Sequence, residues 1–83
     1  MAQTPEKKVK AACVAILKEY GAYYFFPIGT GYSSSGVPDI IVCYNGRFIA
    51  IECKAGNNTI TPLQERNINL IHKNGGFSGG LFK

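Results

Sequence analysis

Hydrophobic residues in the first part of the chain recur with the period of an α-helix. The stripe comprises Val9, Ala12, Cys13, Ile16, Leu17 and Tyr20. Thr4-Pro5-Glu6 precedes it with an N-cap residue, a first-turn proline and an early acid, and Gly21 follows as a helix stop. We therefore expect an amphipathic helix that begins at Pro5 and ends before Gly21.

Three apolar segments follow with the composition of buried strands, at residues 22–28, 37–44 and 47–54. Because they are apolar on both sides, they imply a sheet with helices packed on both faces. Asn45-Gly46, between the last two segments, is the strongest short-range sign of a two-residue type I′ turn. Tyr44 should therefore pair with Arg47 across a hairpin.

A second helix begins at Thr61-Pro62-Leu63-Gln64, which has the form of a capping box. That structural role is sufficient by itself to explain Gln64. The helix should run to Asn74-Gly75-Gly76, with Leu63, Asn67, Leu70 and Ile71 along one side. The element order predicts one small α/β domain over residues 1–83, with a three-stranded mixed sheet, or four strands if residues 77–83 add another.

The hairpin register predicts a cluster of charged side chains. It places Asp39 opposite Glu52 at a non-hydrogen-bonded pair, where Cβ atoms approach to roughly 4.5–5.5 Å, and Lys54 points to the same side. Two carboxylates about 5 Å apart repel by about 3 kcal/mol at an effective dielectric near 20, which a divalent cation would offset. Their hard oxygen atoms suit Mg²⁺ or Mn²⁺ better than Zn²⁺.

An ion pair of Lys54 with either carboxylate on a solvated face is the alternative, since opposite charges across strands are common. The neighbours expected on that face are apolar: Ile41, Cys43, Phe48 and Ala50. A polar trio at the rim of an apolar face favours a functional site over a solvated ion pair.

Three motifs of this chain resemble those of a known enzyme family. Gly36-Val37-Pro38-Asp39, Glu52-Cys53-Lys54-Ala55-Gly56 and Thr61-Pro62-Leu63-Gln64 resemble the PD-(D/E)XK nuclease superfamily and, within it, the VRR-NUC family, in particular its small stand-alone phage members. The resemblance covers about residues 5 to 76 and implies a restriction-endonuclease-like core. The family usually continues into a strand carrying a valine and arginines, whereas this chain continues as Phe77-Ser78-Gly79-Gly80-Leu81-Phe82-Lys83.

The resemblance also implies a Mg²⁺- or Mn²⁺-dependent DNA endonuclease that leaves 5′-phosphate and 3′-hydroxyl ends. The metal would be held by Asp39, Glu52, the Cys53 carbonyl and Glu6, the last directly or through water. Lys54 would orient or help deprotonate the attacking water, and Gln64 would position water or phosphate. Considered without the family, Glu6 is equally well explained as a partner of the helix dipole.

The charge balance favours an acidic partner. Nine Lys or Arg residues face five acids, for a net charge of +4, although many small basic proteins bind nothing acidic. The residues expected to contact DNA are Lys7, Lys8, Lys10, Tyr32, Ser34 and Arg66. The alternatives are a solvated face for the lysines and an inert linker for the loop at residues 29–36, which lacks the ending of a P-loop.

A chain this short has little surface for reading bases, so we expect recognition of DNA shape. Branched DNA such as a Holliday junction or flap is the expected substrate, cut by a two-fold homodimer with paired active sites. The alternative is a catalytically silent nucleic-acid-binding module with the same fold. A third interpretation, an interaction domain without nucleic acid, fits the basic balance less well.

The remaining residues suggest a cytoplasmic protein, in the host cell if the chain is phage-encoded. Cys13, Cys43 and Cys53 show no paired spacing and lie in apolar segments, so we expect reduced core residues. No signal-peptide core or apolar run of ~18 residues is present, so we expect neither export nor a membrane span. His72 lacks a Cys or His partner at ligand spacing and is expected on a helix surface.

Overall fold

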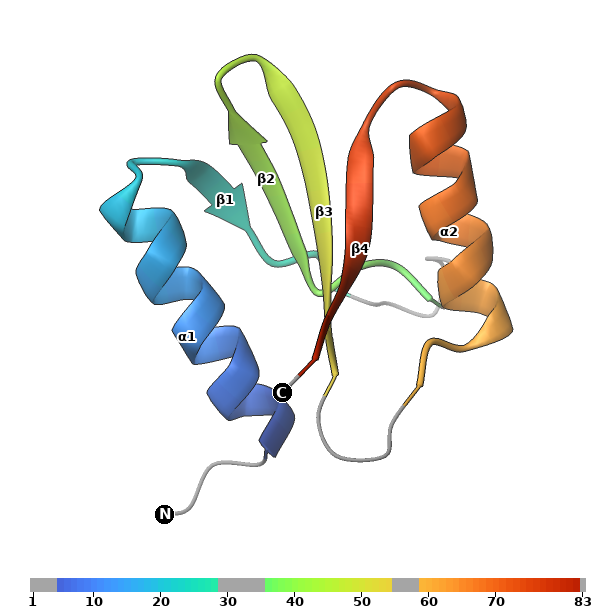
Figure 1. Cartoon of the computed structure of the whole chain (residues 1–83), viewed down its shortest axis with the longest axis horizontal. Helices are drawn as coiled ribbons and strands as arrows, with labels where there is room; N and C mark the ends of the chain where they lie inside the picture. Colours follow the sequence, from blue (N-terminus) through green and yellow to red (C-terminus); the bar gives the residue numbers. More distant parts are fainter. Residues whose placement is uncertain (1–4, 29–35, 55–58, 83) are drawn as a thin grey trace.

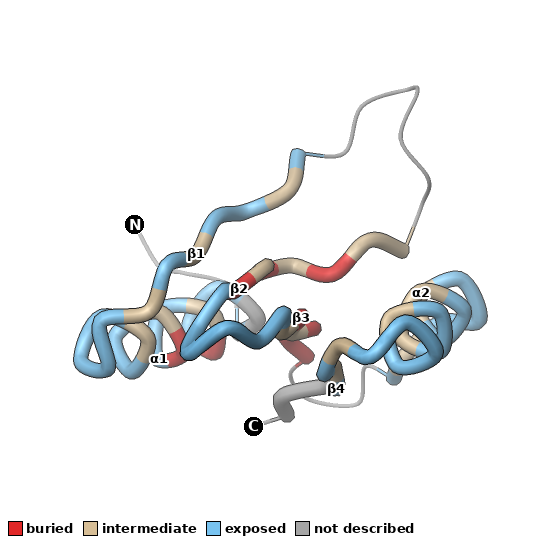
Figure 2. The backbone as a smooth tube through the Cα atoms, turned by 90° about the horizontal axis from the view of Figure 1, so that it is seen from above, coloured by how far each residue is buried: buried red, intermediate tan, exposed pale blue. Residues whose placement is uncertain are grey.

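The structure is a computed structural model that describes residues 5–28, 36–54 and 59–82. Its elements are α1 (Pro5–Glu19), β1 (Tyr23–Phe25), β2 (Ile40–Tyr44), β3 (Arg47–Lys54), α2 (Pro62–Lys73) and β4 (Phe77–Phe82). The strands form one mixed sheet in the order β1-β2-β3-β4 (Figure 1). Seen from above, α1 and α2 lie on opposite faces of this sheet (Figure 2).

The β2–β3 hairpin has the predicted turn and register. Tyr44 pairs with Arg47, and the antiparallel ladder continues to Ile40 and Ile51. Asn45 and Gly46 both have positive φ, at 55° and 76°, as a type I′ turn requires.

A fourth strand, left open by the sequence, closes the sheet on the far side of β3. β4 pairs with β3 in parallel, from Ile49 opposite Phe77 to Lys54 opposite Phe82, and α2 forms the crossover between them. Glycine weakens a strand because it has no side chain to pack. The Gly79-Gly80 pair therefore leaves β4 without a clear strand pattern in the sequence.

The hydrophobic core lies between α1 and the hairpin. Its buried residues are Val9, Cys13, Ile40, Val42 and Cys53. Ala12, Ile16 and Tyr20 are exposed, so the predicted helical stripe is too wide. Residues four apart form parallel rows along a helix, and α1 turns the row of Val9 and Cys13 toward the sheet.

The other face of the sheet is less covered than predicted. Tyr23, Phe25 and Phe48 are 69%, 48% and 48% exposed, and Cys43 is exposed rather than in the core. In Figure 2, α2 lies beside β4 at one edge, away from β1. The prediction that all strands are buried on both faces is therefore wrong for β1 and for the turn end of the hairpin, and β1 is shorter than residues 22–28.

α2 has the predicted capping box and a link to β4 that the sequence did not reveal. The Gln64 amide donates to Thr61 Oγ1 at 3.2 Å, and the Thr61 amide donates to Gln64 Oε1 at 2.9 Å. His72 is exposed, as expected, and its Nε2 lies 2.9 Å from the Ser78 carbonyl oxygen and 3.2 Å from the Ser78 amide. Within the described residues, neither helix has the length and apolar content to cross a bilayer.

Candidate active site

Four segments of the chain lie toward the same end of the sheet. β2 begins there, β3 ends there, and the first turns of α1 and α2 lie at the same end (Figure 1). The N-terminus of a helix carries partial positive charge from its unpaired amides. This end of the molecule therefore combines the predicted carboxylates with two helix starts that favour anions.

Glu52 and Lys54 lie on the same face of β3 because side chains alternate along a strand. They are 4% and 7% exposed, and among the described residues they are the buried side chains that carry charge. Removing charged groups from water costs free energy of folding. A small hydrophobic core does not need buried charges for its stability, so their burial suggests a functional role. Buried charges of both signs at the end of a sheet are typical of a reaction centre.

Asp39 lies immediately before β2 and faces the end of β3. Its Oδ2 accepts a hydrogen bond of 2.8 Å from the Cys53 amide. The next hydrogen-bonded pair of the ladder would join Cys53 to Pro38, which has no N–H to return. The described ladder stops at Ile40 and Ile51, and the Asp39 carboxylate takes over as acceptor. The described ladder ends one residue pair before the expected pairing of Asp39 with Glu52, which stays a prediction.

Cys53 shows how the charges are arranged around this point. Burial raises the pKa of its thiol from 9.0 to about 11, and the Asp39 carboxylate, Cys13 and Glu52 add to the rise while Lys10 opposes it. Both carboxylates and one α1 lysine therefore act on the residue between Glu52 and Lys54. Its thiol belongs to the core with Cys13, so only its backbone is free to serve the site.

Thiol accessibility provides a test of this packing. At pH 8 a disulfide reagent is expected to react rapidly with the exposed Cys43 and slowly with Cys13 and Cys53, whereas all three should react at once in denaturant. The buried Cys53 thiol should also make the free energy of unfolding depend on pH. Its contribution is complete below pH 9 and is lost as pH rises toward about 11, because the thiol ionises at a lower pH in the unfolded chain than in the folded protein. Three equally fast thiols in the folded protein would contradict the core described above.

Gly36 joins the segment that leads into Asp39 to the start of α2. Its φ is +82°, and a Cβ there would lie 2.6 Å from the Leu63 carbonyl carbon and 2.7 Å from the Gln64 amide nitrogen. Backbone therefore lies directly on backbone, which fixes Gln64 close to the Asp39 segment. The Gly-X-Pro-Asp motif carried this signal, but the sequence did not show what the glycine touches.

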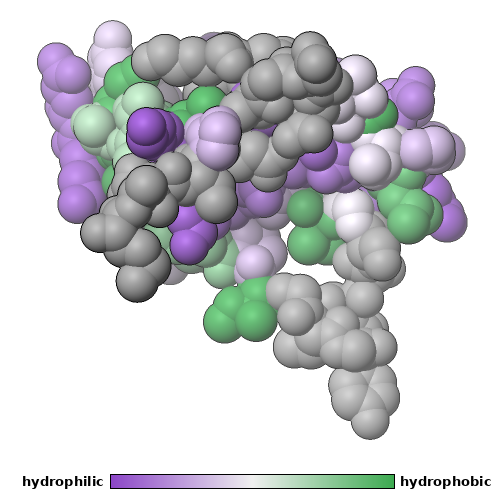
Figure 3. Space-filling model, turned by 90° about the horizontal axis from the view of Figure 1, so that it is seen from below, coloured by the Kyte–Doolittle hydropathy of each residue, from purple (hydrophilic) through white to green (hydrophobic). Residues whose placement is uncertain are grey.

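The predicted DNA contacts are distributed over both helices. Lys7 and Lys8 are exposed on α1, and Arg66 is exposed on α2. Lys10 is half-buried, with its Nζ 4.3 Å from the centre of the Phe26 ring. Viewed from below, hydrophilic residues gather on the flank of α1 and on the flank of α2 (Figure 3).

Three of the predicted site residues are only partly described or not described. Glu6 lies in the first turn of α1, but its side chain is outside the description. Tyr32 and Ser34 lie outside the described residues. Their roles remain predictions.

The donor atoms at this end of the sheet suit a hard cation. No three described His, Cys, Asp or Glu side chains converge as a metal-binding group. Mg²⁺ needs only one or two carboxylates, since waters and substrate phosphate complete its shell. Asp39, Glu52 and the Cys53 carbonyl are oxygen donors of that kind on adjacent strand ends, so the residues present fit such an ion.

Comparison with known proteins identifies the fold. No family model matches the sequence and no curated protein matches it, so membership of the VRR-NUC family stays a prediction. The solved structure of Hjc from Archaeoglobus fulgidus, a Holliday junction resolvase from an archaeal hyperthermophile, is similar with a TM-score of 0.68 and 17% identity. The match covers 93% of this chain and 67% of that one. The chain thus has the predicted restriction-endonuclease-type core, with a four-stranded mixed sheet and two helices.

Proposed function

We propose that this protein is a metal-dependent DNA endonuclease of the VRR-NUC type that hydrolyses phosphodiester bonds in branched DNA, such as a Holliday junction or flap. The observation that carries the proposal is the burial of Glu52 and Lys54 on one face of β3, beside Asp39. The fold it shares with a Holliday junction resolvase supports the same activity. An intact set of three charged residues argues against a silent binding module.

Asp39, Glu52 and the Cys53 carbonyl would hold Mg²⁺ or Mn²⁺, with Glu6 in support. The bound cation would supply positive charge to the phosphate and lower the pKa of the attacking water. The hydrogen bond from the Cys53 amide fixes the Asp39 carboxylate before any ligand arrives. Such preorganisation removes a reorganisation cost from the reaction.

Lys54 would act on the reacting atoms from its buried position. Its ammonium can orient the water that attacks phosphorus, help the deprotonation of that water by stabilising the hydroxide that forms, and donate hydrogen bonds to a phosphate oxygen as charge develops. The bond from phosphorus to the 3′ oxygen then breaks, leaving 5′-phosphate and 3′-hydroxyl ends. Gln64, held at the start of α2 by its capping box, would position water or phosphate.

The two helices would position the DNA. Lys7, Lys8 and Lys10 on α1 and Arg66 on α2 would neutralise phosphates, and Tyr32 and Ser34 would contact the strand from their loop. A two-fold homodimer would present two active sites to a symmetric junction. The proposed place of action is the cytoplasm, which in a phage-infected cell is that of the host.

A cleavage panel tests the proposal. Purified protein is expected to cut four-way junctions or flaps faster than linear duplex with Mg²⁺ or Mn²⁺, and to cut nothing with chelator. Binding should weaken as salt rises, with a log–log slope near −0.9 for each duplex phosphate neutralised. Sedimentation on junction DNA measures the expected dimer.

The outcomes separate the two candidate functions. Tight binding of branched DNA without cleavage in either metal would establish the silent binding module. Absence of any DNA binding at low salt would remove both.

A further inference from the structure

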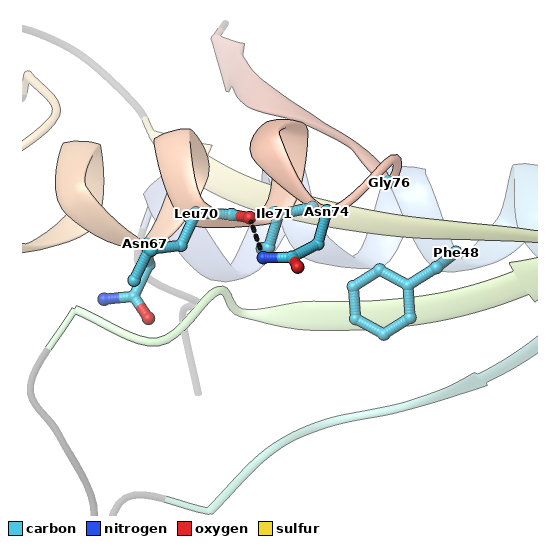
Figure 4. Close-up of a pocket in the computed structure, with 6 residues that line it drawn as sticks. All are labelled: Phe48, Asn67, Leu70, Ile71, Asn74 and Gly76. Atoms are coloured by element: carbon cyan, nitrogen blue, oxygen red, sulfur yellow. Dashed lines mark hydrogen bonds between the residues drawn. The ribbon is translucent and has the colours of Figure 1, made fainter.

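A cavity of about 350 Å³ lies between α2 and the hairpin, and the proposed reaction does not use it. It is lined by Phe48, Asn67, Leu70, Ile71, Asn74 and Gly76 (Figure 4). Phe48 is an even number of residues from Glu52 and Lys54 along β3. Because side chains alternate between the two faces of a strand, Phe48 lies on the same face as these two residues. The cavity therefore opens on the face of the sheet that carries the candidate active site.

The Phe48 ring is held against one wall and open on its other side. A Cβ at Gly76 would lie 2.8 Å from Ile71 Cγ2 and 3.1 Å from Phe48 Cδ1, so only glycine lets the ring approach the turn after α2. Phe48 as a whole residue nevertheless remains 48% exposed, so part of its surface is open to a ligand. A rigid aromatic ring with one supported side and one open side is suited to stacking.

The polar groups of the cavity are neutral amides. Asn74 donates from Nδ2 to the Leu70 carbonyl oxygen at 2.8 Å, which fixes the side chain and directs its oxygen to the Phe48 side of the helix (Figure 4). That oxygen can accept a hydrogen bond from an amino or imino group. Apolar walls with a carboxamide match a flat, uncharged heterocycle.

Positive charge lies on the neighbouring side of α2. Leu70 lines both this cavity and an adjacent hollow that carries Arg66 and Lys73, together with Glu65. A ligand with an uncharged ring and an anionic backbone would satisfy both surfaces, with the ring in the cavity and phosphate near the cations. Nucleic acid has this division of chemistry, whereas an apolar side chain of a second copy would leave the cations unused.

We propose that this cavity binds one unpaired base of the DNA substrate, stacked on Phe48. Phe48 precedes Glu52 by four residues, which is about 13 Å along a strand, or about four nucleotides of a stacked DNA strand. The inference rests on the proposed nuclease function and narrows its substrate. The preferred DNA carries unpaired nucleotides a few positions from the bond that is cut, as a flap or an opened junction does.

Paired leucine substitutions test this assignment in the 83-residue chain with chelator present. Phe48→Leu keeps apolar volume but removes the stacking surface, and is expected to weaken binding of a flapped duplex by about 5- to 50-fold, with fully paired duplex binding unchanged. Phe48→Trp should restore flap binding. Phe77→Leu is the matched control, because Phe77 is 52% exposed and pairs with Ile49, on the other face of the sheet.

The results distinguish failure of the cavity from failure of the function. Quenching of 2-aminopurine at one unpaired position, present in wild type and lost in Phe48→Leu, is expected. If wild type binds and cuts branched DNA but the two leucine variants bind the flap with equal affinity, the cavity assignment alone is overturned. A dimer that Phe48→Leu converts to monomer would assign the cavity to a second copy and also overturn base stacking. Wild type that binds no DNA would overturn both proposals.

Discussion

Replacing Lys54 by methionine is expected to reduce cleavage of branched DNA by at least about a hundredfold while the protein remains folded. Methionine keeps most of the apolar contact of the buried lysine stem and removes only the ammonium. The loss should therefore appear in the rate of the chemical step rather than in DNA affinity. Single-turnover cleavage, filter binding and thermal melting measure the three quantities separately.

Glu52→Gln should give the same loss, since it removes one of the proposed anionic metal ligands and retains the shape of the side chain. Lys18→Met is the matched control, because Lys18 is an exposed lysine in the last turn of α1. Its cleavage rate should equal that of wild type. A Lys54→Met protein that keeps more than a few hundredths of the wild-type rate would exclude Lys54 from the reaction.

Gly36→Ala is expected to destabilise the protein by about 2–4 kcal/mol and to impair cleavage. The left-handed backbone penalises any side chain, and the new Cβ would meet the α2 backbone at 2.6 and 2.7 Å. Domains of this length have a total stability of about 4–12 kcal/mol, so the melting temperature should fall by about 10 °C or more. Calorimetry and cleavage assays below the melting temperature measure the two effects.

Gly75→Ala separates backbone strain from steric conflict. Gly75 has a φ of +89°, close to that of Gly36, but nothing lies within 4 Å of a Cβ placed there. It should lose about 1–2 kcal/mol and keep full activity. Equal destabilisation by the two substitutions would show that the contact between Gly36 and α2 contributes nothing.

Local signals explain what the sequence predicted correctly. The Asn45-Gly46 turn fixes the register of the hairpin through two positive φ angles, so the positions of Glu52 and Lys54 on a common face follow from a few residues. The capping box at Thr61 is equally local, since its two hydrogen bonds join residues three apart.

Features that depend on distant contacts were not predictable. β4 forms because it pairs with β3 and contacts α2, although its own sequence is rich in glycine. Cys43 is exposed because α2 packs beside β4 and leaves the turn end of the hairpin uncovered. The hydrogen bond from the Cys53 amide to the Asp39 carboxylate was not predicted, because it joins residues 14 apart in the sequence beyond the end of the ladder.

The contact of Gly36 with α2 has a consequence for how far the sequence can drift. It holds residues 36–54 against the start of α2, and these two segments contain most of the residues to which the chemistry is assigned. The rest of the chain only needs to support these two segments. Many different side chains can do so in the outer strands, in the distal turns of both helices and over most of the surface. Proteins that share this fold should therefore lose similarity of sequence before they lose similarity of structure. The likeness to Hjc, with a TM-score of 0.68 at 17% identity, is a likeness of fold with little likeness of sequence.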